Sequence, residues 1–139
     1  MKYKVLVANI KGEEFEGWFE LEELENMDDI SLSFIYAENN VSKVAGDYFT
    51  ALCRIREELE KQGVTVICNG ASKDVYPSPM MRDMGDGDQA YRLKIGVPAK
   101  MADVVNIFEV DRDNFIPSTV LEQEEFYQEW LKIKKNSIF

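Results

Sequence analysis

The first 37 residues alternate apolar and polar side chains with the two-residue period of β-strands, and three such segments come before any helical pattern. Residues 3–10 are mostly β-branched or apolar. In residues 15–21, apolar side chains and Gly17 at odd positions alternate with glutamates and Trp18 at even ones. Residues 11–13, Lys-Gly-Glu, supply turn chemistry between these segments, and residues 30–37 repeat the alternation. The sequence therefore predicts a leading hairpin with one acidic face, followed by a third strand.

The clearest helical pattern spans residues 42–62. Ser42 is a suitable N-cap, and Gly63 is a suitable residue to end the helix. Arg54 and Arg56 lie on different sides of this helix, and we expect both to be solvated or paired with neighbouring glutamates. Apolar side chains recur there every three or four residues and form one stripe: Val44, Tyr48, Leu52, Ile55 and Leu59.

The rest of the chain adds shorter elements. Residues 64–68 form a short apolar strand, which would be buried on both faces in the middle of a sheet. Residues 89–96 alternate as a strand with a basic face, and residues 103–110 fit either a strand or a short helix. Thr119 and Glu122 form a capping box that opens a final helix ending in lysines.

These elements show no repeated strand-helix-strand alternation. We therefore predict one α+β domain over residues 1–139, with a mixed or antiparallel sheet of about five strands. One long helix packs on a face of this sheet, and a C-terminal helix follows. A chain of 139 residues is long enough for a single hydrophobic core.

The charge of the chain argues against several partners. The net charge is −10, from 26 acidic and 16 basic residues, and residues 13–29 hold nine carboxylates with no Lys or Arg. Because nucleic acids and anionic membranes attract basic surfaces, we predict neither as a partner. The acidic run is either a solvated strand face or a docking surface for a basic protein. In the second interpretation, the partner-binding residues are Glu14, Glu16, Trp18 and Glu20.

The sequence contains no histidine, which excludes Ser-His-Asp and Cys-His catalysis and histidine-dependent metal sites. The glycine patterns of dinucleotide-binding and P-loop proteins are missing, so we predict no cofactor. Two cysteines, Cys53 and Cys68, are too few for a disulfide-built domain, and we expect both to be reduced and buried. With no signal peptide and no apolar run of membrane-spanning length, a cytoplasmic location is predicted.

Residues 69–88 are rich in turn residues, and loops of this length in compact domains are usually functional or disordered. Lys73 and Arg82 would attract an anionic ligand, and Asp74 or Asp83 would serve as an acid or base. The alternative is that each basic residue pairs with the aspartate beside it and fixes the loop. The candidate ligand-binding residues are Asn69, Ser72, Lys73, Asp74, Tyr76, Ser78, Arg82 and Asp83.

Three aspartates at the end of this segment, Asp83, Asp86 and Asp88, alternate with glycines and offer oxygen atoms of the kind that Ca²⁺ or Mg²⁺ binds. Their spacing is not that of an EF-hand, and Asp-Gly pairs are ordinary turn formers. We therefore predict a turn here and no metal site.

Five stretches of the sequence resemble an uncharacterised family of small bacterial proteins, a domain of unknown function. They are residues 47–59 (DYFTALCRIREEL), 68–71 (CNGA), 74–78 (DVYPS), 81–85 (MRDMG) and 117–120 (PSTV). The resemblance covers about residues 45–132 and leaves the leading hairpin outside. It implies a standalone bacterial cytosolic protein and carries no activity.

Two functional hypotheses follow. The first is a non-catalytic acidic module of a bacterial cell that binds or regulates a basic protein partner, because the acidic run surrounds Trp18 and aromatic residues are frequent interface hot spots. The alternative is a binding protein or enzyme for a small anionic molecule at residues 69–88. The free edges of the hairpin would also allow a homo-oligomer to form.

Overall fold

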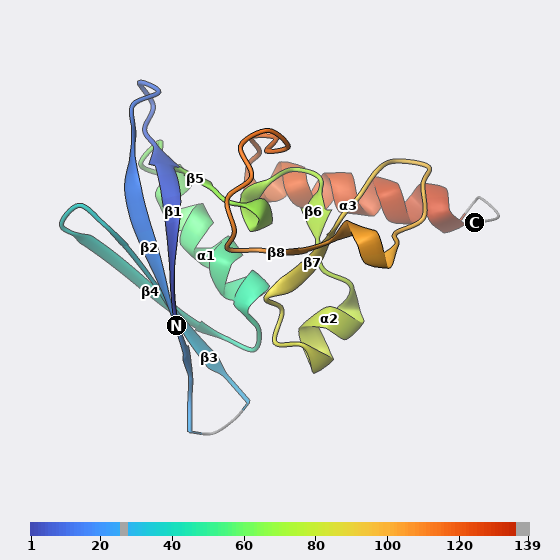
Figure 1. Ribbon diagram of the computed structural model, residues 1–139, viewed down its shortest axis with the longest axis horizontal. Coiled ribbons are helices and arrows are strands. Elements are labelled where there is room, and N and C mark those ends of the chain that lie inside the picture. Colours follow the sequence, from blue (N-terminus) through green and yellow to red (C-terminus); the bar gives the residue numbers. More distant parts are fainter. Residues whose placement is uncertain (26–27, 136–139) are drawn as a thin grey trace.

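The computed structural model describes residues 1–25 and 28–135, and its first half is a five-stranded antiparallel sheet (Figure 1). The strand order is β4-β3-β2-β1-β5. The predicted hairpin and third strand are confirmed, because β1 pairs with β2 and β2 pairs with β3, both antiparallel. The strands are β1 (Lys2–Ala8), β2 (Glu14–Glu23), β3 (Ile30–Tyr36), β4 (Asn39–Ala45) and β5 (Thr65–Ile67).

Helix α1 (Tyr48–Glu60) packs on one face of this sheet and shares its core (Figure 1). The alternation read from the sequence sets which side chains face the helix, since every second residue of a strand points to the same side. Tyr48, Leu52, Ile55 and Leu59 of the helix are buried, as their spacing predicts. Against them lie fully buried strand residues: Val5, Val7, Phe19, Leu32 and Phe34.

The helix is shorter than the sequence predicts, because residues 39–45 form strand β4. Ser42 is therefore not the N-cap. That role belongs to Asp47, whose carboxylate accepts a hydrogen bond from the Thr50 N–H at 2.8 Å. Val44, assigned to the helical stripe, is 52% exposed on β4. The spacing of Val44 fits a helix, but β4 pairs with β3 along its whole length. The backbone hydrogen bonds of this pairing make residues 39–45 a strand.

The apolar segment at residues 64–68 is confirmed as a strand, but β5 lies at the edge of the sheet and not in its middle. It pairs with β1 alone, and Thr65 is exposed. Val66 and Ile67 are buried. The tight turn at Gly63, which has φ +70°, brings the chain from α1 directly into this edge position.

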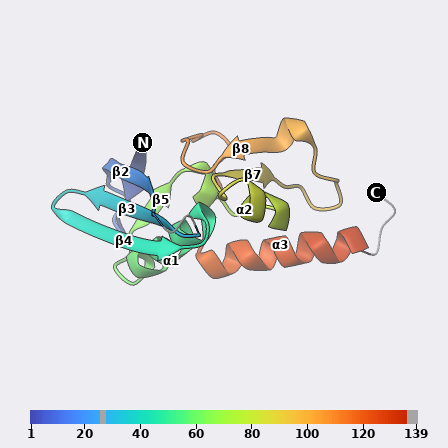
Figure 2. The same cartoon turned by 90° about the horizontal axis from the view of Figure 1, so that it is seen from below.

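The second half of the chain is a smaller layer that lies beside the five-stranded sheet and α1 (Figures 1 and 2). The region at residues 69–88 is folded, and within residues 103–110 only Val104–Asn106 form a strand. The predicted strand at residues 89–96 is shorter than expected, because β7 ends at Arg92. The Thr119–Glu122 capping box is confirmed by reciprocal hydrogen bonds of 2.9 and 3.1 Å. This layer contains a 3-10 turn (Asn69–Ala71), β6 (Val75–Tyr76), α2 (Pro79–Met84), β7 (Gln89–Arg92), a second 3-10 turn (Met101–Asp103), β8 (Val104–Asn106) and α3 (Val120–Lys135).

Phe108 joins the two halves. Its ring centroid lies 5.2 Å from that of Tyr3 on β1 and 5.2 Å from that of Phe19 on β2, and its ring meets Tyr48 of α1 edge-on. The side chain is fully buried.

The antiparallel five-stranded sheet, helix α1 and helix α3 confirm the α+β class predicted from the sequence. Among the described helices, none combines the length and the apolar character that a bilayer crossing needs.

Gly70 provides a test of this packing. A Cβ atom at residue 70 would lie 2.6 Å from Leu52 Cδ2 and 2.8 Å from Ile107 Cβ, so Gly70→Ala would overpack the 3-10 turn (Asn69–Ala71) between α1 and the residue after β8. We expect a loss of about 1–3 kcal/mol of unfolding free energy. Equilibrium urea unfolding measures it.

Gly46→Ala is the matched control, because a Cβ there has no neighbour within 4 Å. It should leave the unfolding free energy within about 0.5 kcal/mol of the wild-type value. Equal stabilities of the two variants would contradict the close approach of α1 to residue 70.

Candidate functional site

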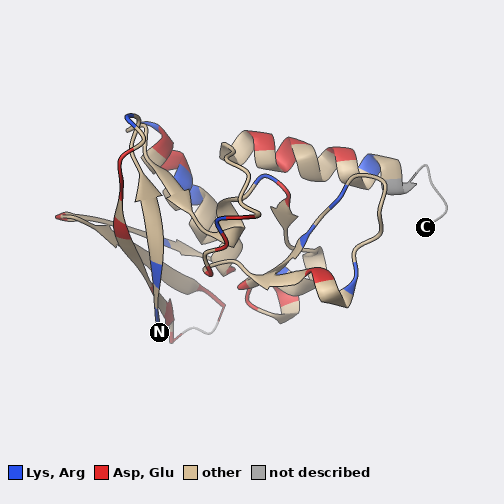
Figure 3. Cartoon of the chain, turned by 45° about the horizontal axis from the view of Figure 1, so that its top comes forward, with Lys and Arg blue, Asp and Glu red and all other residues tan. Residues whose placement is uncertain are grey.

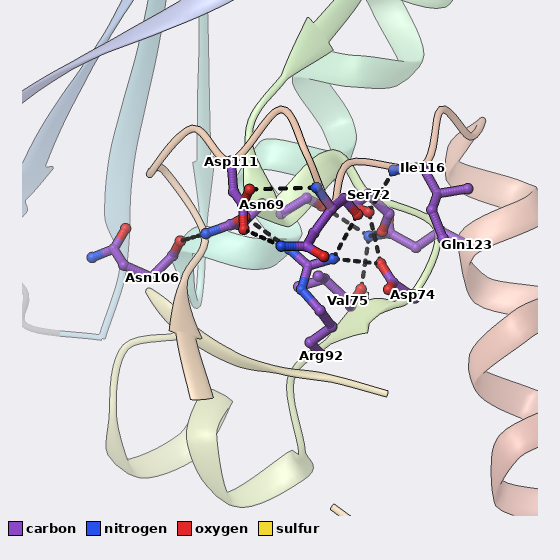
Figure 4. Close-up of polar contacts among 11 residues, drawn as sticks. Asn69, Ser72, Asp74, Val75, Arg92, Asn106, Asp111, Ile116 and Gln123 are labelled. Atoms are coloured by element: carbon purple, nitrogen blue, oxygen red, sulfur yellow. Dashed lines mark hydrogen bonds and ion pairs between the residues drawn. The ribbon is translucent and has the colours of Figure 1, made fainter. Parts of the chain in front are cut away.

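Three of the predicted ligand-binding residues lie in an internal polar network centred on Arg92 of β7 (Figure 4). The guanidinium of Arg92 donates to Asp74 Oδ1 at 2.9 Å and to Asn69 Oδ1 at 3.0 Å. Ser72 donates to the same Asp74 oxygen at 2.7 Å and accepts from the Ile116 N–H at 3.0 Å. These polar groups already have partners in the chain, so Asn69, Ser72 and Asp74 hold the 69–75 segment in place.

A second network, which the sequence does not predict, is built on Arg56 of α1. Arg56 is only 4% exposed and is not paired with the glutamates of its own helix. Its guanidinium donates to Gln123 Oε1 at 2.5 Å and to the Ser118 carbonyl at 2.9 Å, with longer contacts to the carbonyls of Gly70 and Ala71. The expectation of a solvated or ion-paired Arg56 is therefore wrong. The hydrogen-bond partners of Arg56 are the Gln123 side chain and main-chain carbonyl oxygens, not carboxylates.

Gln123 of α3 completes this network, which we call the Arg56–Gln123 clamp. Its side chain is 1% exposed, and its amide nitrogen lies within hydrogen-bonding distance of three backbone carbonyls: Gly70 at 2.8 Å, Ser72 at 2.9 Å and Val75 at 2.8 Å. The clamp thus joins α1, α3 and the 69–75 segment through buried hydrogen bonds. Buried polar groups with several partners fix an arrangement strongly, because each lost bond leaves a desolvated atom.

A groove of about 960 Å³ opens beside this framework, between α2, the segment after β7 and helix α3. Figures 1 and 2 place these elements together on the side of the molecule away from β1–β4. Apolar and aromatic side chains predominate in its lining. The lining residues are Tyr76, Ser78, Pro79, Met80, Asp83, Met84, Tyr91, Leu93, Pro98, Ala99, Tyr127, Trp130 and Leu131.

One wall of the groove is a row of nearly parallel aromatic rings. The centroids of Tyr76 and Tyr127 are 4.0 Å apart, and Trp130 continues the row 6.3 Å beyond Tyr127. The indole N–H of Trp130 donates to the Val97 carbonyl at 3.0 Å, which fixes the loop after β7 against α3. Burial raises the pKa of both Tyr76 and Tyr127, so these phenols are neutral at physiological pH. The wall is therefore rigid and uncharged.

The two basic residues predicted to attract an anion do not meet in one cavity. Arg82 lies over the rings of Phe49 and Tyr76, with its Cζ 5.0 and 5.2 Å from their centroids, and it lines a small separate pocket to which Tyr76 also contributes. Lys73 lies in a shallow pocket with glutamates of α3. Of the eight predicted ligand-binding residues, Tyr76, Ser78 and Asp83 line the groove.

Of the residues in the segment where aspartates alternate with glycines, Asp86 and Gly87 contact the start of α1. The Asp86 carbonyl accepts from the Tyr48 N–H at 2.8 Å, and Gly87, with φ +75°, lies against the Asp47 cap. Burial raises the pKa of the Asp88 carboxyl, and the charge of Asp86 adds to that shift. Over residues 1–25 and 28–135, no three side chains gather as metal ligands.

The acidic hairpin face is balanced by basic residues of the same chain. Lys2 pairs with Glu20 at 3.1 Å, Lys4 with Glu16 at 2.7 Å, and Arg112 holds Glu14 with two hydrogen bonds. The bond from Arg112 lowers the pKa of Glu14. Basic residues mark β1, and acidic residues mark the neighbouring β2 (Figure 3).

Trp18 is 40% exposed between Lys4 and Ile35 of the neighbouring strands. Docking through Glu14, Glu16, Trp18 and Glu20 stays a prediction. The ion pairs leave less free negative charge on that face than the sequence suggests.

No protein-family model matches the sequence, and no curated protein matches it. The resemblance to an uncharacterised bacterial family over residues 45–132 therefore stays a prediction.

Gln123→Ala tests the clamp. The substitution removes the acceptor of Arg56 and the amide NH2 group that lies against three carbonyls, so we expect a loss of about 2–3 kcal/mol of unfolding free energy, measured by urea unfolding. Gln128→Ala makes the same change at an exposed position of the same helix and should be nearly neutral. If both variants lose the same stability, the clamp does not hold α3.

Cys68 is buried as predicted, whereas Cys53 is only partly buried, and the reactivity of the two thiols tests their environments. Burial raises the pKa of Cys53 and of Cys68 to about 11, and both thiols are free. Only the thiolate reacts, so at pH 8 each should react with Ellman's reagent at least about a hundredfold more slowly than an unperturbed cysteine. Both should react promptly in guanidinium chloride. Prompt reaction of either thiol in the native protein would contradict this.

Proposed function

We propose that this protein binds a small molecule with a large apolar body in the groove between α2, the segment after β7 and α3. The observation that carries the proposal is the lining of the groove. Ligand sites are typically cavities of about 300–1,000 Å³ with mostly hydrophobic and aromatic walls and a few polar groups. The groove has this size, and its few polar side chains include Ser78 and Asp83.

The two long walls of the groove differ in rigidity, which suits ligand binding. The aromatic wall is fixed by ring stacking and by the bond from Trp130 to Val97. The α2 wall carries Met80 and Met84, which are 69% and 82% exposed. Methionine side chains are flexible and polarizable, so such a wall can adapt to the shape of a ligand. Large exposed apolar side chains gathered around a hollow commonly mark a binding surface.

The proposed site overlaps the region predicted from the sequence, residues 69–88, but its lining does not favour the anionic ligand that the sequence predicts. The groove is partly formed by residues 76–84, but no Lys or Arg is among its described lining residues. An anion there would lose its hydration without gaining a cationic partner. Asp74, a candidate acid or base, is engaged by Arg92 and Ser72. We therefore propose ligand binding in the groove and assign no reaction to it, although Asp83, the other candidate acid or base, does line it.

Binding of a neutral fluorescent probe tests the proposal. N-phenyl-1-naphthylamine is apolar and becomes strongly fluorescent when it leaves water. We expect the wild-type protein to bind one molecule of it saturably. Ala99→Phe places a ring in the groove and should weaken the affinity at least about tenfold, or about 1.4 kcal/mol.

Ala102→Phe is the matched control, because Ala102 is exposed and lines none of the described pockets. It should bind the probe as the wild type does. Absence of saturable binding to the wild type, or equal affinity of the Ala99→Phe variant, would refute the proposal.

A further inference from the structure

The charged groups around the groove are distributed unevenly. Asp83 alone carries a formal charge among the described lining residues. It is exposed at the end of α2, and no ion pair engages it in residues 1–25 and 28–135. The groove therefore combines an apolar interior with one free carboxylate.

The neighbouring Arg82 does not neutralise this carboxylate. Its guanidinium lies over Phe49 and Tyr76, and it lines the small pocket with Cys53 and Glu57 instead of the groove. The sequence places Arg82 and Asp83 side by side and suggests a local ion pair. In the structure, Asp83 lines the groove and Arg82 lines the small pocket, and Tyr76 contributes to both.

We propose that the ligand of the groove is an organic cation, in which an apolar body lies along the aromatic wall and a positively charged group meets Asp83. The inference rests on the proposed function and assigns the ligand class of that same groove. Both faces of Tyr76 are already occupied, by the stacked ring of Tyr127 and by the guanidinium of Arg82, so the preference for a cation rests on the carboxylate of Asp83. The net charge of −10 would attract such a ligand from solution.

Competition among three probes with the same octyl chain tests this inference. Octyltrimethylammonium is a cation, octyl sulfate is an anion and octyl glucoside is neutral. Each is titrated, below its micelle concentration, against bound N-phenyl-1-naphthylamine. We expect the cation to displace the naphthylamine at a concentration about tenfold lower than the anion, with the neutral probe between them.

Asp83→Asn should reduce the difference between cation and anion to less than about twofold and leave octyl glucoside unchanged, because it removes the charge and keeps the shape. Asp86→Asn removes the same charge from an exposed residue three positions away that does not line the groove. It should keep the preference for the cation. Asparagine suits the left-handed backbone of residue 86, which has φ +63°.

The possible failures are distinguishable. If octyl glucoside displaces the naphthylamine but the cation has no advantage, the ligand class is wrong and the binding function stands. An equal effect of Asp86→Asn would assign the preference to the overall charge and overturn the role of Asp83. If the naphthylamine does not bind at all, both proposals fail.

Discussion

The buried guanidinium of Arg56 is the constraint on which the second half of the structure depends. A charged group in the core is tolerated only when its N–H groups find acceptors, and Arg56 finds them in Gln123 and in main-chain carbonyls. Two of these carbonyls belong to the 3-10 turn after β5, and another precedes α3. The position of α1 therefore determines where the 69–75 segment and the first turn of α3 lie.

The groove is a consequence of that arrangement. The clamp fixes the first turns of α3, and the bond from Trp130 to Val97 fixes the helix about two turns later. Between these two points, Tyr127 reaches Tyr76 on β6 and forms the aromatic wall. On the opposite side, α2 has no buried residue, so its methionines remain available to a ligand. A rigid frame thus supports one fixed wall and one adaptable wall.

Local patterns in the sequence predict the elements well and their assembly poorly. The alternation in residues 15–21, the stripe from Tyr48 to Leu59 and the Thr119–Glu122 box act over a few residues, and each is found in the structure. Val44 misled the helix prediction because its spacing fits the stripe, whereas pairing with β3 decides its structure. Arg56 gave no signal, since its partners lie up to 67 residues away. The groove also draws on three separate segments, so only residues 76–84 were included in the predicted site.

The two tryptophans allow the central claim to be tested in one spectrum. Trp130 lines the groove, and Trp18 lies on the outer face of the five-stranded sheet, so their indole N–H groups report on the two candidate surfaces. In a ¹⁵N-¹H correlation spectrum, titration with octyltrimethylammonium should shift the Trp130 indole signal saturably and leave the Trp18 signal in place. A shift of the Trp18 signal with no change at Trp130 would contradict the account.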